Sequence, residues 1–107
     1  MGGAMTARVI GFPKQKTFRS EKLRRAVAAL PCVDCGREGQ TQAAHSNQGK
    51  GLSIKASDAR LMALCVTCHS KLDQGGVLTK DERRRYEDEM VARTLVALIE
   101  NGTLEVA

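Results

Sequence analysis

The sequence predicts a small α+β fold of one domain, in which two short strands lie between two Cys-x-x-Cys pairs and a long helix follows. The chain has 107 residues, the size of a single domain. Its four cysteines form the pairs Cys32/Cys35 and Cys65/Cys68, with 29 residues between them. Residues 79–102 then show a helical period. A chain this short buries little apolar surface, so a staple between the two pairs would stabilise it.

Residues 1–19 are expected to form a basic, flexible arm that precedes the domain of residues 20–107. The arm is rich in Gly, Lys and Thr and shows no sustained period. Residues 1–31 hold seven bases and one acid, while the whole chain has a net charge of +5. Such a concentration of positive charge favours a polyanionic partner. The alternative is a solvated basic tail that binds nothing.

The first helix is expected over residues 20–30. Ser20 can cap its N-terminus, and Pro31 ends it. Its apolar residues recur at helical spacing, at Leu23, Val27 and Leu30. The stretch PCVDCG follows as a tight turn, in which Gly36 suits a positive φ.

Two strands are expected over residues 41–46 and 60–64, followed by a helix over residues 65–72. The last helix begins at a capping box of Thr79 and Glu82 and closes at Asn101 and Gly102. Its apolar stripe is expected to be ordinary core and consists of Tyr86, Met90, Val91, Leu95, Leu98 and Ile99.

The sequence also indicates where the protein works. No apolar run is long enough to span a bilayer, and the N-terminus does not resemble a signal peptide. We therefore expect the protein in the cytoplasm, with no membrane partner. In that reducing compartment, we expect four cysteines to be metal ligands rather than disulfides.

The cysteine pairs predict a structural zinc site made of Cys32, Cys35, Cys65 and Cys68. Each Cys-x-x-Cys turn can direct two thiolates at one ion, and four thiolates close the coordination shell of zinc. Binding of the ion would stabilise the fold directly. The alternatives are four unrelated buried cysteines and a redox or iron centre.

The two histidines follow a pattern of their own. His45 lies near the end of the first expected strand, and His69 directly follows the last cysteine. The order CxxC, His, CxxCH resembles the HNH, or ββα-metal, endonucleases. The stretch AAHSNQGKGLSIKASDARLMALCVTCHSKLDQG is similar to a phage and prophage subset of that family, the RecA-dependent Ref-type nucleases. The resemblance covers residues 30–76.

The resemblance implies a fold, a chemistry and partners. It implies a ββα-metal motif in which His45 is the general base and His69 binds a catalytic divalent ion such as Mg²⁺ or Mn²⁺. It implies cleavage of DNA in phage recombination inside a bacterial host, with a RecA-type recombinase as a possible partner. The expected phosphate contacts are Lys14, Lys16 and Arg19 of the arm and Lys50 and Lys55 of the loop after the base.

The sequence departs from the family pattern at two positions. Many members carry an Asp just before the base, where it binds the ion, and this chain has Ala44. Arg60 stands where the middle Asn is usual. Asp58 and Asp73 could compensate as ion ligands, although Asp58 could equally cap a short turn and Asp73 could be a solvated helix residue. Asn47 is a weaker candidate for orienting the site.

Two functions therefore remain open. The first is a metal-dependent endonuclease that hydrolyses phosphodiester bonds in DNA. The second is a non-catalytic zinc-binding module that holds DNA or a recombinase. The chain has only three aromatic residues, which argues against a surface that stacks single-stranded bases. Contacts with DNA would be mainly with phosphates and so weakly sequence-specific.

Overall fold

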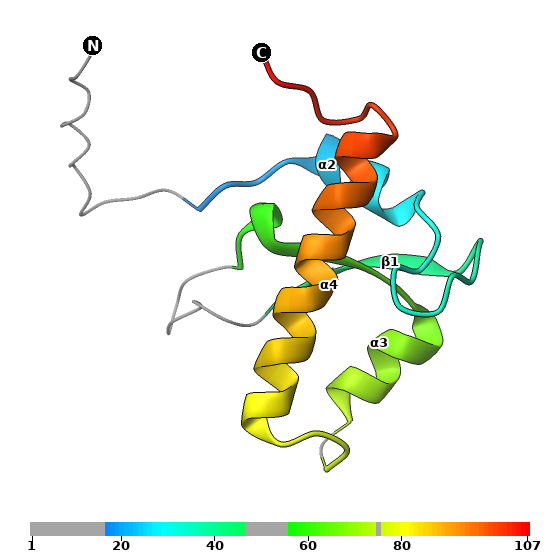
Figure 1. The fold of residues 1–107 in the computed structure, drawn as a ribbon, viewed down its shortest axis with the longest axis vertical. Coiled ribbons are helices and arrows are strands. Elements are labelled where there is room, and N and C mark those ends of the chain that lie inside the picture. The colour runs from blue at the N-terminus through cyan, green and yellow to red at the C-terminus, as the bar shows by residue number, and fades with distance from the viewer. Residues whose placement is uncertain (1–16, 47–55, 75) are drawn as a thin grey trace, which may run out of the picture.

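The fold is known from a computed structural model that describes residues 17–46, 56–74 and 76–107. Its elements in chain order are helix α2 (Glu21–Ala28), strand β1 (Thr41–His45), the 3-10 turn η2 (Asp58–Arg60), strand β2 (Leu61–Cys65), helix α3 (Val66–Asp73) and helix α4 (Lys80–Glu100). The two strands form one antiparallel sheet. The predicted small α+β fold is confirmed, and each expected element is present within two residues of its expected ends (Figure 1).

Helices α2 and α4 each begin where a side chain accepts a hydrogen bond from a free N–H group of the first turn. The Ser20 hydroxyl accepts a hydrogen bond from the Leu23 N–H at the start of α2. Thr79 and Glu82 form both bonds of the predicted capping box at the start of α4. Gly102 follows α4 with a φ of 84°, the left-handed conformation that commonly ends a helix. In the described part of the chain, no helix combines the length and the apolar character needed to cross a membrane.

The register of the two strands decides which side chains share a face of the sheet. Ala43 lies opposite Ala63, and Ala44 lies opposite Met62. Successive side chains of a strand point to opposite faces. Ala44 and Met62 therefore share one face, and Ala43 and Ala63 share the other.

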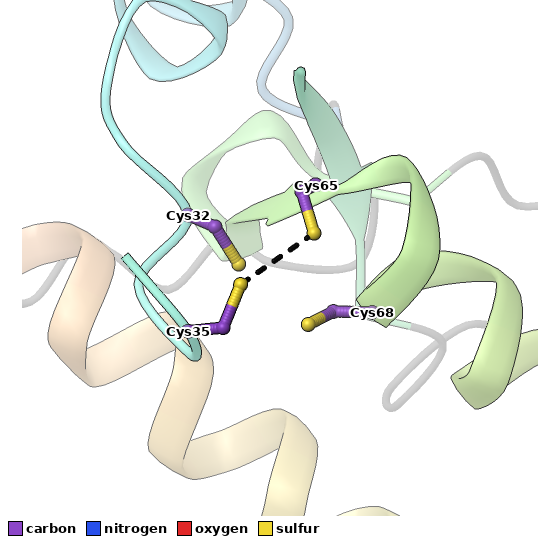
Figure 2. Close-up of side chains that lie close together, drawn as sticks. All are labelled: Cys32, Cys35, Cys65 and Cys68. Carbon is purple, nitrogen blue, oxygen red and sulfur yellow. Dashed lines mark hydrogen bonds between the residues drawn. The ribbon is translucent and has the colours of Figure 1, made fainter. Parts of the chain in front are cut away.

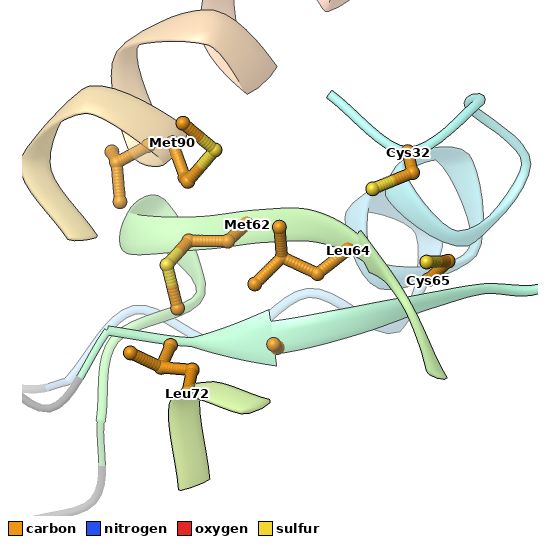
Figure 3. Close-up of a cluster of buried hydrophobic side chains, with 8 residues drawn as sticks. Cys32, Met62, Leu64, Cys65, Leu72 and Met90 are labelled. Atoms are coloured by element: carbon orange, nitrogen blue, oxygen red, sulfur yellow. The ribbon is translucent and has the colours of Figure 1, made fainter. Parts of the chain in front are cut away.

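Helices α2 and α3 cover opposite faces of this sheet. The face that carries Ala44 is covered by Leu72 of α3 and by Met90 of α4 (Figure 3). The face that carries Ala43 is covered by α2 and by Leu98 of α4. Helix α4 runs past β2 (Figure 1). It contributes residues to both buried clusters. The core is thus two small clusters separated by the sheet, and α4 joins them.

Strand β2 is buried along its whole length, whereas β1 is only partly buried. The inner edge of β2 pairs with β1, and its outer edge is occupied at Ala63. The Ala63 N–H donates to the Thr94 hydroxyl of α4 (3.0 Å), and the Ala63 carbonyl accepts from the Val33 N–H (2.9 Å). A strand covered on both faces and both edges requires an uninterrupted apolar sequence, here LMALC.

The apolar stripe expected on the last helix is correct in part. Met90, Val91 and Leu98 are buried, but Leu95 and Ile99 are exposed by 40% and 60%. Helix α4 turns a different line of residues towards β2. That buried line also includes two polar residues that the apolar pattern could not indicate, Glu87 and Thr94.

Two neighbouring residues of α4 test this assignment of the core. Leu98→Ala removes a side chain that is 1% exposed and is expected to lower the free energy of unfolding by about 2–5 kcal/mol. Ile99→Ala removes a side chain that is 60% exposed. It is expected to change the free energy of unfolding by less than about 0.5 kcal/mol. Denaturant unfolding of both zinc-loaded variants measures the difference. Equal losses for the two would show that the assignment of the buried face is wrong.

Candidate functional site

The four cysteine side chains meet in one cluster (Figure 2). Their sulfur atoms all lie within 4.8 Å of one another. Cys32 and Cys35 lie in the turn after α2, Cys65 is the last residue of β2, and Cys68 lies in the first turn of α3. Two segments that are distant along the chain, the turn after α2 and the junction of β2 with α3, therefore come together at one point.

A tight turn presents the first cysteine pair to the cluster. The Gly36 N–H donates to the Cys32 carbonyl (2.8 Å), and Gly36 has a φ of 83°, which glycine adopts without strain. The Tyr86 hydroxyl of α4 donates to the Asp34 carboxylate in the middle of the turn (2.7 Å). Helix α4 thus holds the turn as well as the core.

The cluster fits a tetrahedral ion such as zinc. Four thiolates bound to one zinc ion stand about 3.8 Å apart, and the sulfur atoms of Cys35 and Cys65 are 3.7 Å apart. A disulfide needs about 2.05 Å, and all four cysteines are free. The interpretation as four unrelated cysteines is therefore wrong. The cluster is a candidate metal centre, and its geometry is consistent with structural zinc.

The surroundings of the sulfur atoms favour some thiolates and oppose others. A hydrogen bond from the Cys68 N–H, at the start of α3, lowers the pKa of Cys65 to about 6. Burial raises the pKa of Cys32, but backbone hydrogen bonds outweigh it and the pKa is lowered. Burial and the neighbouring cysteines raise the pKa of Cys68. Several thiolates cannot share this space unless a cation offsets their repulsion, which a bound metal ion would do.

His45, the last residue of β1, is held by a buried carboxylate. Its Nε2 atom lies 2.7 Å from Oδ1 of Asp58. The imidazole is 29% exposed, while the Asp58 side chain is fully buried. Oδ2 of Asp58 accepts hydrogen bonds from the Ser20 N–H (2.7 Å) and from the Arg24 side chain. Burial alone raises the pKa of Asp58, but the bonds from Ser20, His45 and Arg24 outweigh it and lower the pKa overall.

The sequence allows two roles for Asp58, as a ligand of the catalytic ion or as the cap of a turn. The cap of η2 is instead Ser57, whose hydroxyl accepts from the Ala59 N–H. Both oxygens of Asp58 are used by His45, Ser20 and Arg24. The structure therefore brings Asp58 to the expected base and not into a group of ion ligands.

His69 lies in the first turn of α3 and has two polar neighbours. Its Nδ1 atom is 2.7 Å from Oε1 of Gln42, and its Nε2 atom is 3.3 Å from Oδ2 of Asp73. Arg83 approaches Oδ1 of the same carboxylate at 3.9 Å. Within residues 17–46, 56–74 and 76–107, the cysteines are the only group of three or more His, Cys, Asp or Glu side chains that could hold an ion. The structure thus pairs His69 with Asp73, and among the described residues no such group includes His45.

The position before the expected base faces α3. Ala44 is 3% exposed and packs in the same cluster as Leu72. By strand alternation Gln42 shares its face, and His45 points to the other. A metal-binding side chain at position 44 would therefore be directed towards α3, which carries His69 and Asp73. Sequence patterns missed Gln42, and only this alternation could have indicated it.

Most of the expected phosphate contacts lie outside the described residues, namely Lys14, Lys16, Lys50 and Lys55, as does Asn47. Arg19 is described, and its guanidinium donates to the Ala56 carbonyl (3.4 Å). The Phe18 carbonyl accepts from the Asp58 N–H (3.0 Å). Phe18 and Arg19, at the end of the expected arm, therefore both contact the segment around Asp58.

Comparisons with known proteins add no assignment. No protein-family model, no curated protein and no solved structure matches the chain. The function must be argued from the site itself. The site comprises the four-cysteine cluster, His45 beside the buried Asp58 carboxylate, and His69 beside the exposed Asp73 carboxylate.

The metal centre leads to a direct test. Protein purified without added metal is expected to contain about one zinc ion per chain by elemental analysis. Cys32→Ala is expected to reduce this content well below one equivalent and to lower the stability sharply, because binding of the ion contributes to folding. Ser70→Ala, an exposed position on α3, is the matched control and should retain the metal. A parent without zinc, or a Cys32→Ala protein as stable as the parent, would refute the zinc site.

Proposed function

We propose that this chain is a metal-dependent endonuclease that hydrolyses phosphodiester bonds in DNA, with β1, β2 and α3 as a ββα-metal motif. The four cysteines would hold a structural zinc ion at one end of the motif. His69 and Asp73 would hold a catalytic divalent ion, and His45 would be the general base. The observation that carries this proposal is the contact between His69 and Asp73.

That contact brings together two groups that both offer electron pairs. Oε1 of Gln42 can only accept, so the bond at 2.7 Å requires a proton on Nδ1 of His69. In the neutral ring, Nε2 then carries a lone pair and faces the Asp73 carboxylate at 3.3 Å. Two such groups stay together when a cation, either a proton or a metal ion, neutralises them. Mg²⁺ typically takes one or two carboxylates, several waters and substrate phosphate oxygens, so two protein ligands are sufficient.

His45 suits the part of general base. Histidine titrates near neutrality and can both take and release a proton at physiological pH. The imidazole is partly exposed at the end of its strand, so water can reach it. In hydrolysis, the water oxygen forms the new bond to phosphorus, its proton passes to the histidine, and the bond to the leaving oxygen breaks. A divalent ion at His69 would stabilise the charge that develops on the phosphate.

A second function is favoured by three observations. By strand alternation, His45 and Gln42, the partner of His69, point to opposite faces of the sheet, whereas a base and an ion that act on one phosphate must converge. Ala44 offers no ligand on the face towards α3. The Arg83 guanidinium also stands 3.9 Å from Asp73 and can supply positive charge there without an ion. The alternative is therefore a non-catalytic zinc-binding module that holds DNA or a RecA-type recombinase. The resemblance to recombinase-dependent phage nucleases makes a recombinase filament on DNA the partner to include in any assay.

Substitution of the two histidines separates these functions. His45→Ala is expected to lower the rate of plasmid cleavage by about 10²–10⁴-fold, with little change in DNA affinity and no loss of zinc. His69→Ala is expected to abolish cleavage at low Mg²⁺ or Mn²⁺ and to recover part of it at high concentrations, because it weakens binding of the ion.

The assay needs both metal ions, with and without recombinase-coated DNA. A parent that binds DNA but cleaves none of these substrates would refute the nuclease and support the binding module. Unchanged cleavage by His45→Ala would exclude His45 as the base.

The arm provides a separate test of DNA binding. Removal of residues 1–16 deletes three bases, Arg8, Lys14 and Lys16, and leaves the hydrogen bond of Phe18 in place. If the arm binds phosphates, the slope of log affinity against log salt should become shallower, by up to about 0.9 for each phosphate that the shortened protein no longer neutralises. A full-length variant with these three residues changed to Gln is the control, because it removes charge without shortening the chain. An unchanged slope in both would mean that the arm is a solvated tail.

A further inference from the structure

We propose that Asp58 is a positioning residue for His45, which keeps a proton on Nε2 and thereby makes Nδ1 the nitrogen that accepts a proton from water. Arg24 and the Ser20 N–H hold Asp58 in the position this requires. The proposal rests on the proposed function for its catalytic consequence. Its structural part concerns one hydrogen bond and can be tested without any activity.

The two oxygens of Asp58 have separate tasks. Oδ1 is directed at Nε2 of His45 at 2.7 Å. Oδ2 is held by the Ser20 N–H at 2.7 Å and by Arg24. The side chain is 0% exposed, so water cannot replace these partners. A buried carboxylate with three donors around it is fixed in orientation and stays ionised, and it therefore fixes the orientation of the imidazole.

This bond determines where the proton lies on His45. An ionised carboxylate only accepts hydrogen bonds, so Nε2 must carry a hydrogen. In the neutral ring Nδ1 is then the basic nitrogen. When Nδ1 takes the proton of the attacking water, Asp58 stabilises the positive ring while remaining ionised, as the carboxylate does in a Ser-His-Asp triad. No proton moves to Asp58.

The two acidic residues that could compensate as ion ligands differ in exposure. Asp73 is 60% exposed, so its carboxylate is open to an ion and to a phosphate. Asp58 is completely buried, and Arg24 occupies one of its oxygens. An ion at Asp58 would have to displace an arginine from a fully buried carboxylate, which is costly. The burial assigns Asp73 to the ion and Asp58 to the base.

The same hydrogen bonds attach the N-terminal segment to the base. Ser20 caps α2 and Arg24 lies within that helix, while the Phe18 carbonyl accepts from the Asp58 N–H at 3.0 Å. Residues 18–24 and η2 are therefore joined by several bonds that converge on Asp58. Helix α2 is thus part of the support of His45 as well as part of the core.

Nitrogen-15 NMR of the His45 ring at about pH 8.5, above the ordinary histidine range, tests the bond directly. The parent is expected to show a hydrogen on Nε2 only, with a downfield signal that exchanges slowly with water. Asp58→Asn should lose the slow exchange. Because that variant leaves Arg24 unpaired, Asp58→Asn with Arg24→Gln is the second variant, and Arg25→Gln, an exposed neighbour on α2, is the control. Zinc content shows that each variant is folded.

Cleavage of supercoiled plasmid DNA with Mg²⁺ or Mn²⁺ tests the catalytic consequence. The double variant is expected to lose about 10²–10⁴-fold in kcat with little change in KM, whereas Arg25→Gln should keep both. A parent hydrogen on Nδ1, or a double variant that keeps the protected Nε2 signal or the parental kcat, overturns the positioning role and leaves the nuclease intact. A protected Nε2 signal in a parent that cleaves no DNA overturns the nuclease, and with it the catalytic part of this proposal.

Discussion

The meeting of four cysteine side chains is the constraint on which the rest of this structure depends. A two-stranded sheet is at best marginally stable in water, and the two buried clusters on its faces are small. The cysteines join the turn after α2, the end of β2 and the start of α3. That junction holds α3 against the sheet at this end, together with the hydrogen bond between Gln42 and His69. The positions of His69 and Asp73 follow from it, because both lie on α3, the helix whose first turn carries Cys68.

Helix α4 is the second support, and it acts through polar contacts as well as apolar ones. The Thr94 hydroxyl accepts a hydrogen bond from the Ala63 N–H on the outer edge of β2. The Tyr86 hydroxyl donates to Asp34 in the first cysteine turn. The buried Glu87 accepts a hydrogen bond from Ser46, the residue after His45. A buried polar group is favourable only when its partner is present. These contacts therefore specify one position of α4 relative to the metal centre and to the end of β1.

The two histidines occupy different environments and are suited to different tasks. His45 contacts a buried carboxylate already held by Ser20 and Arg24, an arrangement that orients a ring. His69 contacts an exposed carboxylate that has room for a further ligand. The same pair of residue types, His and Asp, thus forms a contact with a buried carboxylate in one place and a contact with an exposed carboxylate in the other. Burial of the carboxylate makes the difference, because it decides whether an ion can reach it.

The sequence by itself determined the order of the elements, the capping box and the grouping of the cysteines, because each depends on local geometry or on a short, regular spacing. It also placed His69 and Asp73 on one helix face, since they are four residues apart. Only the tertiary structure decided that Asp58 contacts His45, that Gln42 contacts His69, and that Glu87 and Thr94 rather than Leu95 and Ile99 face the sheet. These facts depend on the strand register and on the rotation of α4 about its axis. Contacts between residues far apart in the chain set both, and no local pattern records them.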